Sequence, residues 1–436
     1  MSGSGKRFLL LSGMPIGHSA GLAADLIKAL EARGHKVDFL TRDIDAELRS
    51  RPVGFRRMAK TLVRAARRNL RFIDKAAADV NRWLGRGVEN NIDFKYPITH
   101  PDDSETPLPI ETITDRIHGN YDAVITLYWQ SMISAGTLQL LHERLGVPIL
   151  IYAVDMEPFT GGCHYFSNCR NYKSQCGRCP GLRSDDPADQ SHQNYLIKKG
   201  IYSNIPCRLL CNTWMGNIAA DSGLFGPGQI VKFHICLDDN LFRPMDVAET
   251  RRFFDIPDSK KHILLFRYSD FDPRKGFPIL TDALARLYES MTRRERSETL
   301  LLIAGSPLEN AGSMLPFDYK HLGLLDQQQL IRAYNASTLF LSPSVDDAGP
   351  SMVNQAILCG TPCVTFAIGT AIDVIQTGVS GYKARNFDAA DFACGTLEIL
   401  RLPEGEYRTL RAASREMGLK CNSLDAAASV IESALK

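Results

Sequence analysis

The chain has 436 residues, which suffices for two or three domains of roughly 100–200 residues each. Its 44% hydrophobic and 23% charged residues are an ordinary globular composition, which excludes a disordered, collagen-like or coiled-coil chain. The net charge of +2 argues against a polyanion-binding protein as a whole. No stretch reaches the roughly 18 consecutive apolar residues that span a bilayer.

The first half opens with the pattern of a strand, a glycine-containing loop, a helix and a second strand. The segments that predict this βαβ unit are Phe8–Ser12, Gly13–Ala20, Gly21–Arg33 and Lys36–Leu40. Further apolar runs predict strands at Ala123–Leu127 and Pro148–Ala153.

The second half repeats the alternation. Strands are predicted at Ile263–Phe266, Leu300–Ala304, Leu339–Leu341 and Pro362–Phe366, with helices at Phe277–Tyr288, Gln327–Ala336 and Met352–Leu358. Such alternation implies parallel sheets with helices on both faces. We therefore expect an α/β protein of two doubly wound, Rossmann-like domains, residues 1–240 and 241–436. The last predicted helices, Glu404–Met417 and Leu424–Leu435, either close the second domain or pack back on the first.

Four of the eleven cysteines are clustered. Cys163, Cys169, Cys176 and Cys179 have the spacing C-x5-C-x6-C-x2-C. The apolar run after Arg7 is shorter than the core of a signal peptide, so we expect a cytoplasmic protein and reduced thiols. Four thiolates with a C-x2-C pair suit a closed, structural zinc site. They equally suit a 4Fe-4S cluster, and free thiols or two disulfides are the remaining interpretations; zinc is the preferred one.

A basic segment stands apart in composition. Residues 49–86 carry twelve Lys and Arg residues against Asp74 and Asp79, with apolar residues at three- and four-residue spacing. This pattern predicts an amphipathic basic helix over about 50–86. Its cations, over 56–86, either bind an anionic membrane surface, which would place the protein on the inner membrane face, or form an ordinary solvated face. Nucleic-acid binding is not expected, since Phe55, Phe72 and Trp83 are its only aromatic residues.

Two loops in the second half carry ligand-binding patterns. Cations in Arg267–Gly276, between a strand and a helix, are typical of a diphosphate site; the alternative is a solvated basic loop. In Ser344–Pro362, Gly349, Pro350 and Ser351 suit a helix start whose N–H groups face an anion or a sugar. The alternative there is a capped helix with an acidic pair, Asp346 and Asp347, that favours its dipole.

Taken together, these segments resemble the retaining GT-B glycosyltransferases of family 4, also called group 1. The segments that carry the resemblance are Arg267-Tyr…Pro273-Arg274-Lys275-Gly276, Asp347 to Gln355 in place of a Glu-x7-Glu motif, Cys359-Gly-Thr-Pro-Cys-Val364, Gly369 to Gly381 and the interdomain run 237–244. Thr160-Gly-Gly-Cys-His-Tyr165, with the other three clustered cysteines, resembles a subgroup that builds bacterial surface polysaccharides.

The resemblance implies two domains facing a cleft and a hexosyl transfer, with retention, from a nucleotide-diphosphate sugar to a hydroxyl of a glycan or lipid-linked acceptor. It implies that Arg267 and Lys275 neutralise the diphosphate and that Asp347 holds sugar hydroxyls, which makes these three the catalytic candidates. The donor-binding residues it implies are Gly17, Arg267, Arg274, Lys275, Asp347, Gly349, Pro350, Ser351 and Gln355. No catalytic divalent metal is expected, since the two cations neutralise the diphosphate.

Three residues depart from the family pattern. Val154 stands where the family has an active-site His, Gln355 where it has a ribose-binding Glu, and His18 where it has a second loop glycine. Val154 and Gln355 favour a rival function, a non-catalytic sugar-nucleotide or glycan-binding protein of the same fold. The enzyme remains the preferred interpretation, because a retaining transfer of this type is thought to use the donor phosphate itself as the base.

Overall fold

The computed structural model describes residues 5–14, 21–42, 102–269, 272–308 and 311–436. The predicted basic helix over 50–86, together with Gly17 and His18, lies outside the described residues. Among the described helices, none is long and apolar enough to cross a membrane.

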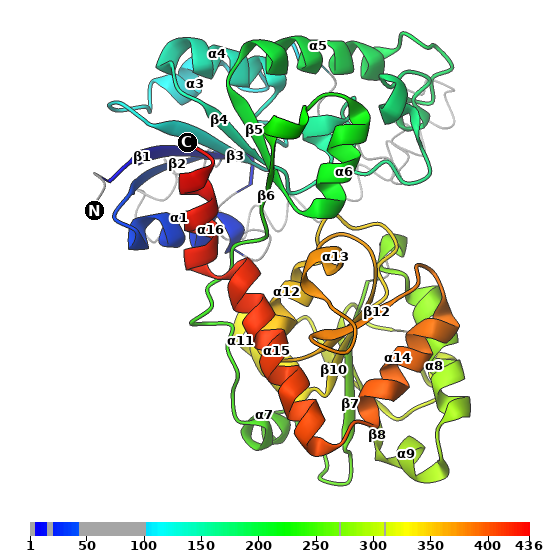
Figure 1. Cartoon of the computed structure of the whole chain (residues 1–436). Coiled ribbons are helices and arrows are strands. Elements are labelled where there is room, and N and C mark those ends of the chain that lie inside the picture. The colour runs from blue at the N-terminus through cyan, green and yellow to red at the C-terminus, as the bar shows by residue number, and fades with distance from the viewer. Residues whose placement is uncertain (1–4, 15–20, 43–101, 270–271, 309–310) are drawn as a thin grey trace, which may run out of the picture.

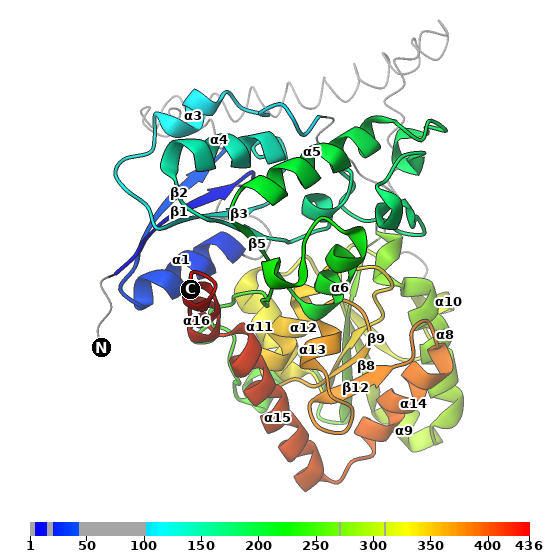
Figure 2. The ribbon, with the colours of Figure 1, turned by 45° about the horizontal axis from the view of Figure 1, so that its top comes forward.

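The first sheet has six parallel strands in the order β2-β1-β3-β4-β5-β6. They are β1 (Arg7–Ser12), β2 (Lys36–Thr41), β3 (Ala123–Leu127), β4 (Ile149–Tyr152), β5 (Cys207–Cys211) and β6 (Ile230–Lys232). The described α-helices of this half are α1 (Leu22–Ala32), α3 (Ile110–Thr114), α4 (Ala135–Leu145), α5 (Gln190–Asn204) and α6 (Thr213–Ser222). Figure 2 shows α4 and α5 on one face of the sheet and α1 on the other. The central strands are buried on both faces, which explains their unbroken apolar runs.

The second sheet is also parallel and six-stranded, in the order β12-β11-β10-β7-β8-β9. Its strands are β7 (His262–Tyr268), β8 (Thr299–Gly305), β9 (Tyr319–Gly323), β10 (Leu339–Ser342), β11 (Cys363–Phe366) and β12 (Gly381–Ala384). The helices around it are α7 (Val247–Phe253), α8 (Phe277–Ser290), α9 (Arg293–Glu298), α10 (Ala311–Met314), α11 (Gln327–Ala336), α12 (Ser351–Leu358), α13 (Ala371–Val374), α14 (Ala389–Leu400) and α15 (Glu404–Asn422). Two doubly wound α/β sheets confirm the predicted fold class.

The chain ends on the first sheet. After α15, helix α16 (Leu424–Ser433) packs against α1, and its Ile431 is buried in the same core as Leu26 and Leu30 (Figure 1). Arg33, after α1, also donates hydrogen bonds to Asp425. The last helix therefore ties the two halves of the molecule together.

A second link joins the halves beside the cleft between them. Asp373 of α13 accepts hydrogen bonds from the Thr213 backbone N–H (2.9 Å) and hydroxyl (2.6 Å), and pairs with Lys232. The Asn212 side chain donates to the Ala348 carbonyl. These contacts align the end of the first sheet with the α12 and α13 region of the second.

Candidate functional site

A cleft of about 1070 Å³ lies between the two sheets. Residues from the first half that line it include Val154, Tyr165, Asn212 and His234. Of the predicted donor-binding residues, Arg267, Lys275, Gly349, Ser351 and Gln355 line it from the second half. The fold thus brings both predicted loops to one cavity, because each follows the carboxyl end of a parallel strand.

Lys275 and Asp347 connect the two loops. Lys275 Nζ lies 2.5 Å from Asp347 Oδ2, and the Gly349 N–H donates to Asp347 Oδ1 at 3.2 Å. Gly276 permits this docking, because its φ is +70° and a Cβ there would lie 1.9 Å from the Pro343 carbonyl oxygen. Asp347 is buried and does not itself line the cleft, whereas Lys275 does. The Asp347 carboxylate therefore holds the ammonium group of Lys275 in position at the cleft.

The start of α12 faces the same cavity. Pro350 is its N-cap residue and offers no side-chain cap, which leaves backbone N–H groups available at the helix end. Gly349 and Ser351 line the cleft beside Lys275 and Arg267. Two cations and a helix N-terminus are the features that recognise a phosphate.

Gln355 lies further along α12 and is 3% exposed. Its Oε1 accepts a hydrogen bond of 2.9 Å from the hydroxyl of Tyr334 on α11. The carboxamide is thereby fixed at the cleft wall.

Arg274 lies beside the cleft and is not part of its lining. Its Nε and a terminal nitrogen each lie 2.9 Å from the Asp272 carboxylate, and its guanidinium stacks on the ring of Tyr165, 3.7 Å from the centroid. This arginine therefore forms a bridge between the two domains, and its donor-binding role stays a prediction.

Behind Val154 lies a buried polar group that sequence analysis did not assemble. His164 Nδ1 lies 2.6 Å from Asp155 Oδ2, and its Nε2 lies 3.4 Å from Glu157 Oε2. Burial opposes the charge on His164, but Asp155 outweighs it and raises the pKa of the imidazole to about 9. Burial, and then repulsion by Asp155, raises the pKa of Glu157 to about 8. These shifts favour a His–Asp ion pair and a glutamic acid that holds its proton more tightly than an exposed one.

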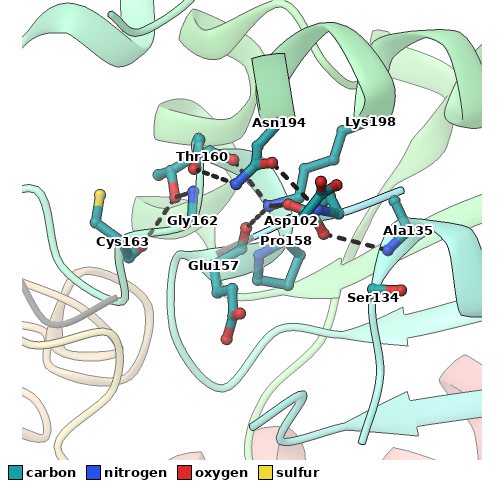
Figure 3. A network of polar contacts seen from close by, with 12 residues as sticks. Asp102, Ser134, Ala135, Glu157, Pro158, Thr160, Gly162, Cys163, Asn194 and Lys198 are labelled. Carbon is teal, nitrogen blue, oxygen red and sulfur yellow. Dashed lines mark hydrogen bonds and ion pairs between the residues drawn. The ribbon is translucent and has the colours of Figure 1, made fainter. Parts of the chain in front are cut away.

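A second buried ion pair supports the same turn. Lys198, on α5, is fully buried and lies 3.0 Å from Asp103 Oδ2. Its ammonium also donates to the Glu157 and Thr160 carbonyls at 2.7 and 2.9 Å (Figure 3). Sequence analysis missed this pair, because its partners come from segments far apart in the chain.

The four clustered cysteines line one small enclosed cavity, together with Phe166 and Tyr172. Backbone N–H groups point at two of the sulfurs, Gly161 at Cys176 (3.2 Å) and Asn171 at Cys169 (3.4 Å). All four are free thiols, so the structure pairs none of them in a disulfide. Sulfurs bound 2.3 Å from a tetrahedral zinc lie about 3.8 Å apart. Among the described residues, Asp155, Glu157 and His164 bring three possible ligand atoms within 4.8 Å of one another, and the clustered cysteines do not. Their sulfurs are therefore more widely spaced than zinc ligands.

Comparison with known structures defines the class of fold. HepE of Anabaena, solved with UDP and glucose, matches over 99% of both chains with a TM-score of 0.57 at 12% identity. Sucrose-phosphate synthase of Thermosynechococcus elongatus matches over 98% of both chains with a TM-score of 0.59 at 17% identity. The protein therefore has the GT-B fold, two Rossmann-like domains around a cleft.

Sequence comparison points to the same class of protein. Residues 248–417 match the family model described as Glycosyl transferases group 1, the family that the motifs resemble. The chain is 24% identical to D-inositol 3-phosphate glycosyltransferase of Actinosynnema mirum over 65% of each chain. It is 28% identical to the enzyme of that name from Mycolicibacterium smegmatis over 68% of this chain and 63% of that one. The chain thus spans slightly less than two thirds of the length of these relatives.

Proposed function

We propose that this protein transfers a hexosyl group from a nucleotide-diphosphate sugar to a hydroxyl acceptor, with retention at the anomeric carbon. The observation that carries the proposal is the group of Arg267, Lys275 and the α12 N-terminus in one cleft, with Lys275 aimed by Asp347. In the transfer, the bond between the anomeric carbon and the diphosphate oxygen breaks as the acceptor oxygen bonds to that carbon. The acceptor proton moves to the departing diphosphate, whose charge Arg267 and Lys275 stabilise.

This mechanism explains why Val154 can stand where the family has an active-site histidine. If the leaving diphosphate takes the proton, the protein must supply position and charge stabilisation and needs no side-chain base at that point. UDP-glucose is the first donor to test, and UDP the first nucleotide, because HepE shares the fold and was solved with UDP-glucose. We propose a glycan or lipid-linked sugar as the acceptor, in polysaccharide or glycoconjugate assembly.

Proton NMR during turnover distinguishes the proposed transferase activity from the rival function, that of a non-catalytic binding protein. The protein is mixed with sugar conjugates of UDP, GDP and ADP, with and without candidate saccharide acceptors. We expect one donor to be consumed with its anomeric configuration retained in the product, and Lys275→Ala to abolish turnover. A donor that binds tightly and is never consumed would contradict the proposal and support the rival function.

We also propose that the four clustered cysteines hold a structural metal, with zinc preferred. Support comes from their shared cavity and from the two N–H groups aimed at sulfur, since such donors stabilise thiolates. Binding of zinc would bring the four sulfurs closer together, whereas a 4Fe-4S cluster would fit sulfurs that lie farther apart. Elemental analysis and the visible spectrum of freshly purified protein distinguish zinc, which is colourless, from iron. Folded protein with neither element would refute the proposal.

The segment 56–86 remains a predicted membrane contact, in keeping with a lipid-linked acceptor and a place on the inner membrane face. Co-sedimentation with vesicles tests it. Binding to vesicles that contain phosphatidylglycerol, lost when the arginines of the segment are replaced by glutamine, is the expected result. Equal recovery with neutral and anionic vesicles would favour the solvated-face interpretation.

A further inference from the structure

One histidine in the cleft forms no hydrogen bond through its ring nitrogens within the described part of the chain. His234 follows β6, lines the cleft and is 9% exposed. Among the residues that the structure describes, neither Nδ1 nor Nε2 has a hydrogen-bond partner. A buried polar group left unsatisfied costs about 1–3 kcal/mol, so its retention at a cavity wall points to a ligand.

The charged groups near His234 do not satisfy it. Its Nε2 lies 3.9 Å from Asp373 Oδ2, beyond hydrogen-bond distance, and Asp373 is already bound by Thr213 and Lys232. Burial is the main cause of a lowered pKa for His234, and Lys232 adds to it, against the attraction of Asp373. A neutral imidazole has one N–H donor and one acceptor nitrogen.

A second unsatisfied donor lines the same cleft from the other domain. Asn354, on α12, is fully buried, and within the described part of the chain its Nδ2 has no acceptor. Its Oδ1 is engaged by the Thr370 hydroxyl at 3.0 Å. Thr370 and Asp373 belong to one turn, since the Asp373 N–H donates to the Thr370 carbonyl at 3.0 Å. His234 and Asn354 therefore lie against the same turn, one from each domain.

We propose that His234 and Asn354 form a subsite for the hydroxyl groups of a carbohydrate ring of the donor. The two side chains together offer two hydrogen-bond donors and one acceptor, without net charge. Such a set fits hydroxyl groups, which both donate and accept hydrogen bonds. It does not fit a phosphate, for which Arg267 and Lys275 already provide positive charge. The ring is either the ribose or the transferred sugar. Because the groups come from both domains, the ligand also favours the closed cleft. This inference rests on the proposed function.

The variant His234→Leu tests it, with Asn354→Leu as its counterpart. Leucine removes the two ring nitrogens at similar bulk, so the ligand-free melting temperature should stay equal or rise, while ligand affinity falls about 3–10-fold for a lost hydrogen bond. A purely structural histidine predicts the reverse, a lower melting temperature and unchanged affinity. His234→Gln, which keeps a donor and an acceptor, should recover part of the affinity.

Calorimetry with UDP, GDP, ADP and their glucose conjugates identifies the ring. If His234→Leu weakens the free nucleotide and the conjugate equally, the ring is the ribose; if it weakens the conjugate alone, the ring is the sugar. Wild-type binding with unchanged affinities in both leucine variants would overturn the subsite and leave the proposed function intact. A wild-type protein that binds none of these probes would overturn both.

Discussion

Arg274 of the C-terminal domain stacks on Tyr165 of the N-terminal domain, 3.7 Å from the ring centroid. Tyr165 follows Cys163 and His164 directly and lines the cleft, so the loop that carries the cysteine cluster also positions the ring that contacts Arg274. Burial raises the pKa of the Tyr165 hydroxyl, which keeps the ring neutral beneath the cation. The contact joins the proposed metal loop to the loop 267–276, the proposed diphosphate site.

Replacing Tyr165 tests the bridge. A cation–π contact contributes about 0.5–2 kcal/mol, so Tyr165→Leu should raise the KM for the donor about 3–10-fold, with a smaller change in kcat. Tyr165→Phe keeps the aromatic face and should remain near wild type. Steady-state kinetics of the two variants decide the matter, and indistinguishable KM values for Leu and Phe would rule out the bridge.

Cysteine replacement tests the metal site. Cys176 lines the cluster cavity, whereas Cys394 is an exposed thiol elsewhere on the surface. We expect Cys176→Ser to lose bound metal and to lower the melting temperature, and Cys394→Ser to change neither. The readouts are metal content per chain and thermal unfolding. Equal behaviour of the two variants would argue for four free thiols.

The buried pair of Lys198 and Asp103 should be a large term in stability. Lys198→Met removes the cation and leaves a carboxylate buried without its partner, which costs about 3–5 kcal/mol in the free energy of unfolding. Adding Asp103→Asn should recover part of that loss, because the buried charge is gone. Lys173→Met is the matched control, since Lys173 and its partner Asp221 are both about half exposed. Urea unfolding of all four proteins gives the comparison, and a similar cost for Lys173 and Lys198 would contradict the account.

Asp25, on α1, should make stability depend on pH. Burial raises the pKa of its carboxyl from 3.8 to about 7, against a backbone hydrogen bond from Asp238 that lowers the pKa. The folded state therefore holds a proton that the unfolded state releases, and this contribution to stability is lost as pH rises from about 4 to about 7. Asp25→Asn should match wild type near pH 4 and be more stable by roughly 1–2 kcal/mol above pH 7, after allowance for partial solvent screening.

Thermal unfolding of Asp25→Asn across that range is the measurement. Asp258→Asn, an exposed position before β7, is the control and should show no pH-dependent difference from wild type. A constant offset between Asp25→Asn and wild type at every pH would exclude titration of this carboxyl as the cause.

Much of the fold is predictable from sequence because the parallel strands are buried on both faces. Apolar runs such as Phe8–Leu11 and Leu339–Leu341 mark those strands clearly. The sequence analysis does not predict β5, β6, β9 and β12. Strand β6 is short and partly exposed, and β5, β9 and β12 interrupt their apolar residues with arginine, lysine, histidine or glycine.

The site was predictable where it depends on local order along the chain. Arg267 lies at the carboxyl end of β7, and Lys275 and Asp347 follow parallel strands, so the fold places the three at one edge. The direction of Arg274 was not predictable, because it depends on Tyr165, more than a hundred residues earlier. The same holds for His234 and Asn354, because the three-dimensional fold decides which of their nitrogens lack hydrogen-bond partners among the described residues.

The most direct test of the central claim is nucleotide binding by calorimetry, with wild-type protein and the double variant Arg267→Ala/Lys275→Ala. The account predicts that the wild type binds one of UDP, GDP or ADP, and that the double variant loses at least about 100-fold in affinity, since each charged hydrogen bond contributes about 1.5–3 kcal/mol. Without ligand the double variant should melt lower than wild type, because Lys275→Ala leaves the buried Asp347 carboxylate without its cation, so circular dichroism first establishes that the variant is folded at the temperature of the titration. Equal nucleotide affinity in the two proteins would contradict the diphosphate site and, with it, the proposed transfer.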